Sequence, residues 1–330
     1  MIDYNFFYFL FSSLIINIIL FNLYINFANR FNILDRSNNF HNPTTITSGG
    51  IIIFLNLLLG YFFLQLSYED FNQALPNNII WTFVGLTILF IISLIDDLKP
   101  INPKIKLVFQ IIVIYFSLTS LKITQIELPL KVSIFLFCVS WVYITNIINF
   151  IDGVDGFAST QLIFIFFNLI LINYFMDIKN FSNYLSLILI PPLIIFFYFN
   201  KPNAKIYLGD AGSIILGFIV GYVILDLIIL KQYLLAISLI IYPLTDCTIT
   251  LIKRVLNKNL PWVKKEDYFF SKLQVLDIMN KTYIFRVNIL FCILNSFFIL
   301  LQILIDEYFF MLNIFLTIVT IFIYNNKKFI

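Results

Sequence analysis

A succession of long apolar runs constrains this chain more than any other feature. Hydrophobic residues make up 61% and charged residues 12% of its 330 residues, whereas soluble domains average about 25% charged residues. A membrane span needs about 20 mostly apolar residues to cross roughly 30 Å of hydrocarbon. Eleven runs approach that length, at about 4–27, 51–68, 79–95, 104–121, 132–149, 159–176, 183–199, 213–230, 232–252, 284–304 and 307–324. The sequence therefore predicts a polytopic integral membrane protein.

The predicted fold class is all-α, with about 11 transmembrane helices in a single membrane domain covering 1–330. Helices are expected because an open strand cannot satisfy its backbone groups in lipid. Helix breakers at Pro191-Pro192 and at Pro243 predict a kink or a local opening of two of these spans. The first run lacks a preceding basic region, so we expect a retained span and not a cleaved signal peptide.

Cysteine content gives no indication of a disulfide-rich protein, and net charge gives none of a nucleic-acid-binding protein. The three cysteines, Cys138, Cys247 and Cys292, are odd in number and lie inside or at the end of apolar runs. This is typical of free thiols and not of a disulfide framework. The net charge of +3 gives no indication of a nucleic-acid partner. The partner that composition does imply is the membrane itself.

The positions of the basic residues predict the orientation of the chain. With the N-terminus outside, only Lys122, Lys131, Lys179 and Lys231 of the 21 basic residues lie in external segments. The positive-inside rule then places the loops after the odd-numbered spans in the cytoplasm. We expect the active site on these loops, at residues 28–50, 96–106, 146–158, 200–213 and 253–283.

The stretch from Asn146 to Ala158, NIINFIDGVDGFA, has the most specific spacing in these loops. Asp152 and Asp155 each precede a glycine, so the backbone can turn tightly and approach a ligand. Asn146, Asn149 and Asp152 follow one another at intervals of three and share roughly one face of a helix end. The competing interpretation is structural: a glycine ends one helix and an aspartate caps the next.

Five carboxylates are predicted to meet on one side of the membrane, namely Asp96, Asp97, Asp152, Asp155 and Asp210. Such a cluster is hard to hold together without cations. Carboxylate oxygens are ligands for a hard ion, while lysines and helix N-termini suit phosphate. The combination favours a Mg²⁺-assisted phosphoryl site over a set of unrelated helix caps.

Four motifs, taken in order, resemble the polyprenyl-phosphate N-acetylhexosamine-1-phosphate transferases, which form glycosyltransferase family 4. This membrane family includes undecaprenyl-phosphate GlcNAc-1-phosphate transferase and the phospho-MurNAc-pentapeptide translocase. The motifs are HNPT at 41–44 followed by GG at 49–50, IDD at 95–97 followed by KL at 106–107, NIINFIDGVDGFA, and YLGDAGS at 207–213. PLTD at 243–246 also looks like the family's ninth span. Each motif is weak alone, but the ordered set is highly specific.

The resemblance implies transfer of HexNAc-1-phosphate from a UDP-N-acetylhexosamine to a polyprenyl (undecaprenyl) phosphate, with Mg²⁺ or Mn²⁺ as cofactor and UMP as the second product. It also implies the initiating step of a cell-envelope polysaccharide, such as the O-antigen of lipopolysaccharide, at the bacterial inner (plasma) membrane. In-line displacement by the lipid phosphate is the expected chemistry. A covalent intermediate on Asp96 or Asp97 stays open, as does the choice between a monomer and a homodimer.

The resemblance also assigns roles to individual residues. Asp210 is similar to the family's metal ligand, with Asp97 beside it, and Asp96 to the carboxylate proposed to deprotonate the lipid phosphate. The remaining expected site residues are Asp97, Asp152 and Asp155 as further catalytic acids, Asn149 near the nucleotide, Lys106 as a phosphate contact, and His41 as part of the substrate-binding set.

The loop after the ninth run departs from the family pattern. Relatives usually carry a histidine motif there, but this loop reads LPWVKKEDYFFSKLQ. We expect Lys264 or Lys265 to make the diphosphate contact instead, with Glu266 and Asp267 at a helix start. The competing interpretation is that these lysines only obey the positive-inside rule or touch anionic lipid. The first loop is shortened as well, which weakens the assignment of His41.

Two other classes of function compete with the transferase. A catalytically inactive relative that acts as a binding or scaffold protein is suggested by the missing histidine. A transporter would carry its acidic residues in the middle of its spans and would often show inverted repeats, whereas here the acids lie at the ends of spans on one side. The retained set of five carboxylates favours the enzyme.

Overall fold

The structure is a computed structural model that describes residues 4–31, 33–34, 45–178, 180–258, 267–271 and 278–325. Within these ranges the regular elements are helices, and only isolated bridges join Leu34 to Ile46 and Ile46 to Ile206. The α-helices are α1 (Tyr4–Arg30), α2 (Gly50–Ser67), α3 (Glu69–Ala74), α4 (Ile79–Leu98), α5 (Pro103–Ser117), α6 (Leu130–Ile151), α7 (Phe157–Phe175), α8 (Phe181–Asn200), α9 (Gly209–Ile229), α10 (Tyr233–Leu239), α11 (Ile241–Leu256), α12 (Ile278–Leu304) and α13 (Phe310–Asn325). Short 3₁₀ turns are η1 (Leu118–Ser120), η2 (Ile123–Gln125) and η5 (Glu307–Phe309).

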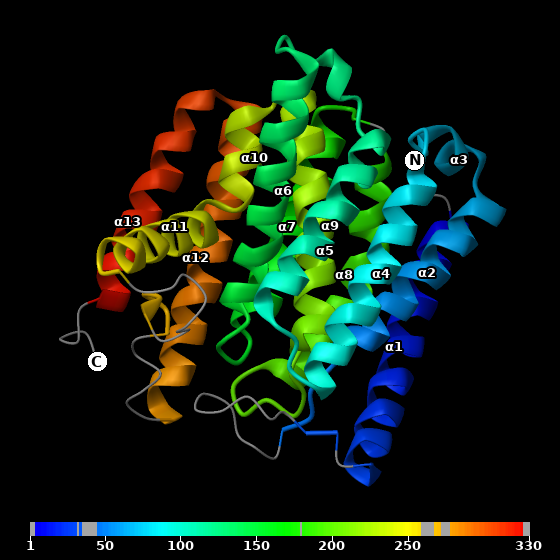
Figure 1. Ribbon diagram of the computed structural model, residues 1–330, viewed down its shortest axis with the longest axis vertical. Helices are drawn as coiled ribbons and strands as arrows, with labels where there is room; N and C mark the ends of the chain where they lie inside the picture. The colour runs from blue at the N-terminus through cyan, green and yellow to red at the C-terminus, as the bar shows by residue number, and fades with distance from the viewer. Residues whose placement is uncertain are drawn as a thin grey trace.

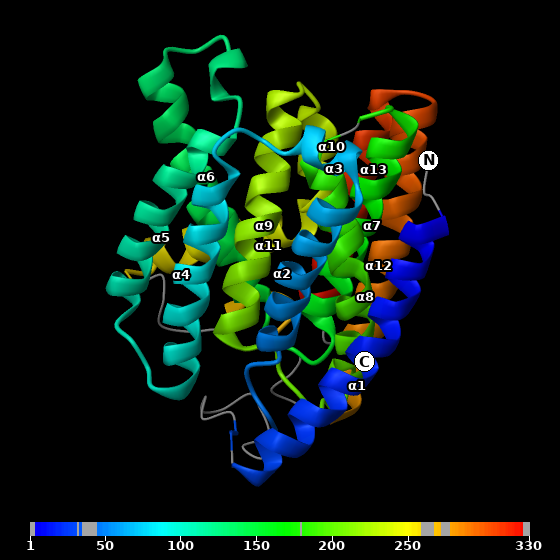
Figure 2. The ribbon, with the colours of Figure 1, turned by 90° about the vertical axis from the view of Figure 1, so that its right-hand side faces the viewer.

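The predicted membrane architecture is confirmed. Ten helices in the described ranges are long and apolar enough to cross a membrane, and the number is eleven if the bent pair α10 and α11 is counted as one span. Most of the long helices run along the length of the molecule, as two views at right angles show (Figures 1 and 2). The three cysteines are free, as expected. The chain is therefore a multi-pass, all-α membrane protein.

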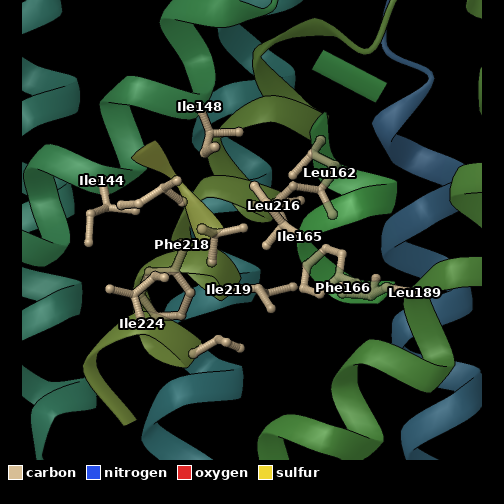
Figure 3. Packing of buried hydrophobic residues seen from close by; sticks show 14 of the residues in the cluster. Ile144, Ile148, Leu162, Ile165, Phe166, Leu189, Leu216, Phe218, Ile219 and Ile224 are labelled. Carbon is tan, nitrogen blue, oxygen red and sulfur yellow. The ribbon is translucent and has the colours of Figure 1, made fainter. Parts of the chain in front are cut away.

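Helix α9 forms the centre of the bundle. Of the 18 most apolar consecutive residues of α9, 89% are buried inside the protein, a larger share than in any other span of the described chain. It is apolar on all sides, which is the pattern of a helix surrounded by other helices. It packs most extensively against α6 and α4, and Phe218 and Ile219 of α9 lie among side chains from neighbouring helices (Figure 3). The surrounding helices can thus hold the start of α9 in a fixed place.

Glycines let α9 approach two neighbouring helices closely. A Cβ atom on Gly217 would lie 2.5 Å from the carbonyl oxygen of Thr145 in α6. A Cβ atom on Gly50 of α2 would lie 2.2 Å from the backbone of Gly212 in α9. Small residues are typical of helix contacts in membranes because they allow the backbones to pack against each other. These contacts fix α9 relative to α2 and α6.

The ninth span is broken, as the sequence predicts, but the break lies three residues before Pro243. Helices α10 and α11 meet at Ile240 at an angle of 75°, and α11 lies across the bundle axis (Figure 1). Pro243 instead occupies the first turn of α11, where its missing N–H costs no intrahelical bond. The other predicted kink is not seen as an interruption, because α8 continues through Pro191-Pro192.

The polar motifs gather at one end of the bundle, which we call the site end. Here α4 and α6 finish and α5, α7 and α9 begin. Asp96 and Asp97 belong to the last turn of α4, and Asp210 to the first turn of α9, so these acids lie at the ends of spans, as expected. The ends of two helices, α4 and α9, therefore present carboxylates to the same region.

Candidate active site

A cavity of about 860 Å³ opens at the site end and joins a polar part to an apolar part. Its polar wall includes Asp96, Asp97, Lys106, Asn149, Asp152 and Asp210. Its apolar wall, from α5 and α6, includes Leu107, Ile111, Phe135, Val139 and Val142. Such a shape suits an amphiphilic ligand, because a charged group and a hydrocarbon chain can be bound in one continuous space.

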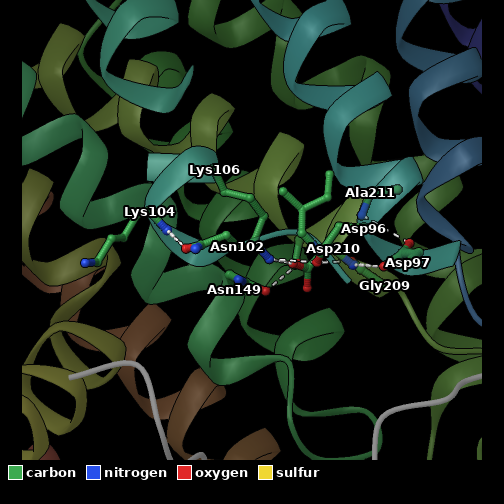
Figure 4. Close-up of polar contacts among 11 residues, drawn as sticks. Asp96, Asp97, Asn102, Lys104, Lys106, Asn149, Gly209, Asp210 and Ala211 are labelled. Carbon is green, nitrogen blue, oxygen red and sulfur yellow. Dashed lines mark hydrogen bonds and ion pairs between the residues drawn. The ribbon is translucent and has the colours of Figure 1, made fainter. Parts of the chain in front are cut away.

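Lys106 connects two carboxylates of the polar wall. Its ammonium group donates to Asp96 Oδ2 and to Asp210 Oδ2, each at 2.7 Å (Figure 4). The three side chains are between 13% and 20% exposed, so the pairs are largely shielded from solvent. Asp96 also accepts the backbone N–H of Ile101 at 2.6 Å. A cation held between two carboxylates can move towards an incoming phosphate, which competes with them for it.

Asp97 is the carboxylate that anchors the start of α9. Its oxygens accept the backbone N–H of Asp210 at 2.7 Å and that of Ala211 at 3.3 Å, and Ser48 donates its hydroxyl at 2.8 Å. A carboxylate at a helix N-terminus is favourable, because it satisfies unpaired N–H groups and complements the helix dipole. Asp97 therefore holds Asp210 in place, in addition to lining the cavity.

Gly209 allows this close approach. Its φ of +73° lies in the left-handed region, and a Cβ atom there would sit 2.4 Å from Asp97 Oδ2. Glycine is the residue that satisfies both demands, since it has no side chain and adopts this φ without strain. The close approach of Asp97 thus explains why a glycine precedes Asp210 in the YLGDAGS motif.

The end of α6 contributes the amide side chains of the cavity. Asn146, Asn149 and Asp152 all line it, which confirms that they share one face. Asn149 accepts a hydrogen bond from the Ser213 hydroxyl at 2.9 Å. Asn146 donates to Gln110 of α5 at 2.7 Å, so the two helices are linked across the cavity floor. The sequence did not single out Gln110.

Asp155 lies apart from the other four predicted acids. It is buried, accepts from Lys281 at 3.4 Å and from the backbone of Ala204 at 3.5 Å, and does not belong to the cavity wall. The competing interpretation of the Asn146 to Ala158 stretch, in which a glycine ends one helix and an aspartate caps the next, is correct only in part. Helix α6 does stop before Gly153, but Gly156, and no aspartate side chain, caps α7.

Arg254 is another cavity residue that the sequence did not single out, because the positive-inside pattern already accounts for a basic residue at this position. Its side chain is 4% exposed, donates to Asp267 at 3.3 Å, and lies 4.8 Å from the centre of the Tyr268 ring. Arg254 and Tyr268 both line the cavity. Arg254 lies eight residues after Asp246 in α11, so both residues lie on one face of the helix. That spacing could have indicated a buried cation.

Three predicted substrate-binding residues, His41, Lys264 and Lys265, lie outside the described residues. Glu266 does as well, whereas Asp267 is described and lies beside Arg254. The expectations for the first three remain predictions.

The donor set of the cavity suits a hard cation that shares its ligands with a substrate. In the described part of the chain, no three His, Cys, Asp or Glu side chains form a group that could hold a metal ion by themselves. Mg²⁺ commonly binds through one or two carboxylates, with substrate phosphates and waters completing its shell. Asp210, Asp97 and Asn149 offer such oxygens along one wall.

Comparison with known sequences supports the motif-based resemblance. The model of glycosyl transferase family 4 matches residues 79–228, a range that contains Asp96, Lys106, Asn149 and Asp210. Arg254 and the broken span lie beyond it.

Individual bacterial relatives extend this similarity. A probable undecaprenyl-phosphate N-acetylglucosaminyl 1-phosphate transferase of Bacillus subtilis is 27% identical over 256 residues, which cover 73% of this chain and 69% of the relative. The phospho-N-acetylmuramoyl-pentapeptide-transferases of Streptococcus sanguinis and Buchnera aphidicola are each 29% identical, over 52% and 60% of this chain. The chain spans 57% and 64% of the lengths of these two relatives.

Proposed function

We propose, from the similarity to glycosyl transferase family 4 and to bacterial polyprenyl-phosphate sugar transferases, that this protein transfers HexNAc-1-phosphate from a UDP-N-acetylhexosamine to a polyprenyl phosphate. The observation that carries the proposal is the two-part cavity. Its acidic end holds a lysine between two aspartates, and its other wall is apolar and comes from two membrane-spanning helices. A lipid phosphate and its hydrocarbon chain match these two parts.

The proposed chemistry is a single displacement at phosphorus. An oxygen of the lipid phosphate attacks the β-phosphorus of the UDP-sugar, and the bond from this phosphorus to the bridging oxygen breaks. The bridging oxygen leaves with UMP, while the sugar phosphate stays on the lipid as a diphosphate. Asp96, whose oxygens accept hydrogen bonds from Ile101 and Lys106, would take the proton of the lipid phosphate.

Lys106 and the start of α9 would carry the electrostatic part of the reaction. The Lys106 ammonium and the N-terminus of α9 can both stabilise negative charge on phosphate oxygens. A bound Mg²⁺ or Mn²⁺, held by Asp210 with Asp97 and Asn149 nearby, would neutralise the diphosphate and the charge that develops on UMP. Arg254 of α11, which also lines the cavity, would bind phosphate oxygens.

The two-step alternative, through a covalent aspartyl intermediate, finds less support for Asp97 than for Asp96. Both Asp97 oxygens accept hydrogen bonds from the start of α9 and from Ser48. A nucleophile engaged in this way would have to give up those bonds before attack. Both Asp96 oxygens accept hydrogen bonds as well, from Ile101 and Lys106, but the Lys106 side chain lines the cavity and can shift to an incoming phosphate, which makes Asp96 the better candidate for a two-step route.

The decisive experiment uses the purified protein in lipid nanodiscs. We expect UMP release only when undecaprenyl phosphate, Mg²⁺ and one of a panel of UDP-GlcNAc, UDP-GalNAc and UDP-MurNAc-pentapeptide are all present, together with a matching lipid-diphosphate sugar. Binding of UDP-sugars without any UMP would favour the inactive scaffold. Failure of every combination to release UMP or to be bound would overturn the proposal.

The cellular setting is part of the same proposal. The basic residues favour a site end that faces the cytoplasm of a bacterial inner membrane, where the product would start a cell-envelope polysaccharide. A reporter fused after Lys328 is then expected in the cytoplasm and one inserted at Asn77 outside. Both reporters on one side of the membrane would contradict this orientation.

A further inference from the structure

We propose that Asp246 is a positioning residue that docks residues 267–271, the 267–271 turn, against α11 and thereby holds the Arg254 guanidinium in the cavity wall, where it receives the diphosphate of the nucleotide sugar. This inference rests on the proposed function for the identity of the ligand. The docking itself rests on contacts among described residues only. Asp246 belongs to the PLTD motif, and the mechanism above gives it no task.

Asp246 is fully buried and makes contacts that reach far along the chain. Its carboxylate accepts the backbone N–H groups of Phe269 at 3.0 Å and Phe270 at 3.4 Å. It also accepts the hydroxyl of Tyr242 at 2.8 Å and that of Thr250 at 3.3 Å within α11. A buried carboxylate is costly unless donors surround it. Here two of the four donors come from a backbone segment more than 20 residues away, so the carboxylate ties that segment to the helix.

The docked turn in turn holds Arg254. Asp267 Oδ2 lies 3.3 Å from Arg254 Nε, and the Tyr268 hydroxyl lies 3.5 Å from Nη1. The guanidinium also stacks over the Tyr268 ring, at 4.8 Å from its centre. Burial raises the pKa of the Tyr268 phenol, so this group stays neutral beside the cation. The turn thus fixes the position of the guanidinium by a charge, a hydroxyl and an aromatic face.

A column of aromatic rings links the same turn to the Asp152 stretch. Tyr268 stacks on Phe150, with ring centres 5.9 Å apart, and on Phe270 at 5.7 Å. Phe270 then stacks on Phe157 at 4.6 Å. Phe150 and Phe157 lie on either side of Asp152 in the sequence, so the turn packs against side chains on both flanks of this acid. Undocking the turn would loosen both Arg254 and its surroundings.

The spacing on α11 makes Asp246 suited to this task. Asp246, Thr250 and Arg254 follow at intervals of four and share one face of the helix. The anchor and the cation are therefore two turns apart on a rigid element, and the 267–271 turn bridges them. The Arg254 side chain is attached to α11 and its guanidinium is held by the 267–271 turn. It can therefore bind a phosphate without first losing conformational freedom.

The test replaces Asp246 by asparagine, which keeps the shape. The amide has one acceptor oxygen, and its NH₂ group meets a backbone N–H as donor against donor. We expect hydrogen–deuterium exchange of the peptide containing residues 267–271 to speed up at least about tenfold. We expect the Kd for UMP, and the KM for the best UDP-sugar of the panel, to rise about tenfold, while kcat falls less than about threefold.

Coupling to Arg254 separates positioning from general destabilisation. Arg254→Lys keeps the charge but loses the planar fork, and we expect a similar rise in KM. In the double variant the two effects should be clearly less than additive, because both act through one guanidinium. Asp267→Asn offers a gentler change should Asp246→Asn fail to fold, since Asp267 is 46% exposed. For this variant a rise in KM of about threefold is expected.

Asp226→Asn is the control, as a partly buried carboxylate near the end of α9 that lies away from the cavity. It should leave the Kd for UMP and the exchange of 267–271 unchanged.

An Asp246→Asn protein with normal exchange and normal UMP binding would overturn the inference, as would equal effects of Asp246→Asn and Asp226→Asn on UMP binding. A wild-type protein that neither binds UMP nor releases it would instead overturn the proposed function and the ligand of Arg254. The exchange measurement would then still decide on the docking.

Discussion

The two ends of α9 carry partly buried carboxylates with different hydrogen-bond partners. At its start, Asp210 pairs with Lys106 at 2.7 Å, and Asp96 binds the same ammonium group. Near its end, Asp226 accepts from the amide of Asn180 and the hydroxyl of Ser182, both at 2.6 Å. Asp210 thus has a charged partner and lines a large cavity, whereas the two hydrogen bonds to Asp226 come from neutral groups at the start of α8.

This contrast shows why a carboxylate inside a membrane protein is not in itself a site. Asp226 fastens the start of α8 to α9, a task that needs acceptors but no reaction space. Asp210 lies next to a cation, a second carboxylate and a cavity, and this combination can bind a charged substrate. Partial burial is common to both residues, so the Lys106 ion pair and the open space make the difference.

The largest expected effect comes from Asp210→Asn. The substitution removes one negative charge without changing shape, and we expect UMP release to fall by about 100-fold or more. Thermal unfolding and size-exclusion profiles should stay close to those of the wild type. Full activity in this variant would remove Asp210 from the site and erase the contrast with Asp226.

A smaller loss is expected from Gly209→Ala, which disturbs the same end of α9 without changing a charge. The new Cβ would sit 2.4 Å from Asp97 Oδ2 on a backbone with φ of +73°, and this φ alone costs alanine about 1–2 kcal/mol. We expect UMP release to fall roughly tenfold to 100-fold, because Asp210 is displaced.

Gly153→Ala is the control for Gly209→Ala. The nearest atoms to a Cβ at Gly153 lie 3.9 and 4.0 Å away, so alanine fits there, and activity should change less than about twofold. Equal losses at Gly153 and Gly209 would show that the start of α9 is no more constrained than the Asp152 stretch.

The smallest effect on activity is expected from Asp226→Asn. Replacing the carboxylate by an amide weakens two hydrogen bonds to charge, so the free energy of unfolding should fall by about 1–3 kcal/mol. Turnover measured well below the unfolding temperature should stay within about twofold of the wild type. A loss as large as that of Asp210→Asn would mean that both ends of α9 serve the reaction.

Sequence reasoning predicted the spans and the meeting of the acids well, because both follow from local rules. Apolar length identifies membrane helices, and the ends of antiparallel neighbours necessarily lie on one side. Asp96, Lys106, Asn149 and Asp210 therefore reach one cavity as predicted. The spacing in the Asn146 to Ala158 stretch also indicated which face of α6 lines it.

The remaining features depend on tertiary packing that local rules do not contain. Asp155 belongs to the same motif as Asp152, yet the turn between α6 and α7 directs it to Lys281 of α12, a partner 126 residues away. Arg254 looked like one of many basic residues near a membrane face, and only the docking of the 267–271 turn makes it a cavity residue. The break of the ninth span lies at Ile240 because α10 ends there, before the proline that suggested it.

The central position of α9 has a consequence for how the protein is made. Helices α4 and α6, which pack around α9, are synthesised before it and enter the bilayer first. Until α9 arrives, they leave a slot that lipid must fill, and the Trp141 indole N–H lacks the Phe218 carbonyl to which it donates at 2.7 Å. The helix that closes this slot also delivers Asp210. A chain stalled during translation before residue 209 would therefore lack the central helix and Asp210, and its Lys106 would have Asp96 but not this second carboxylate as a partner.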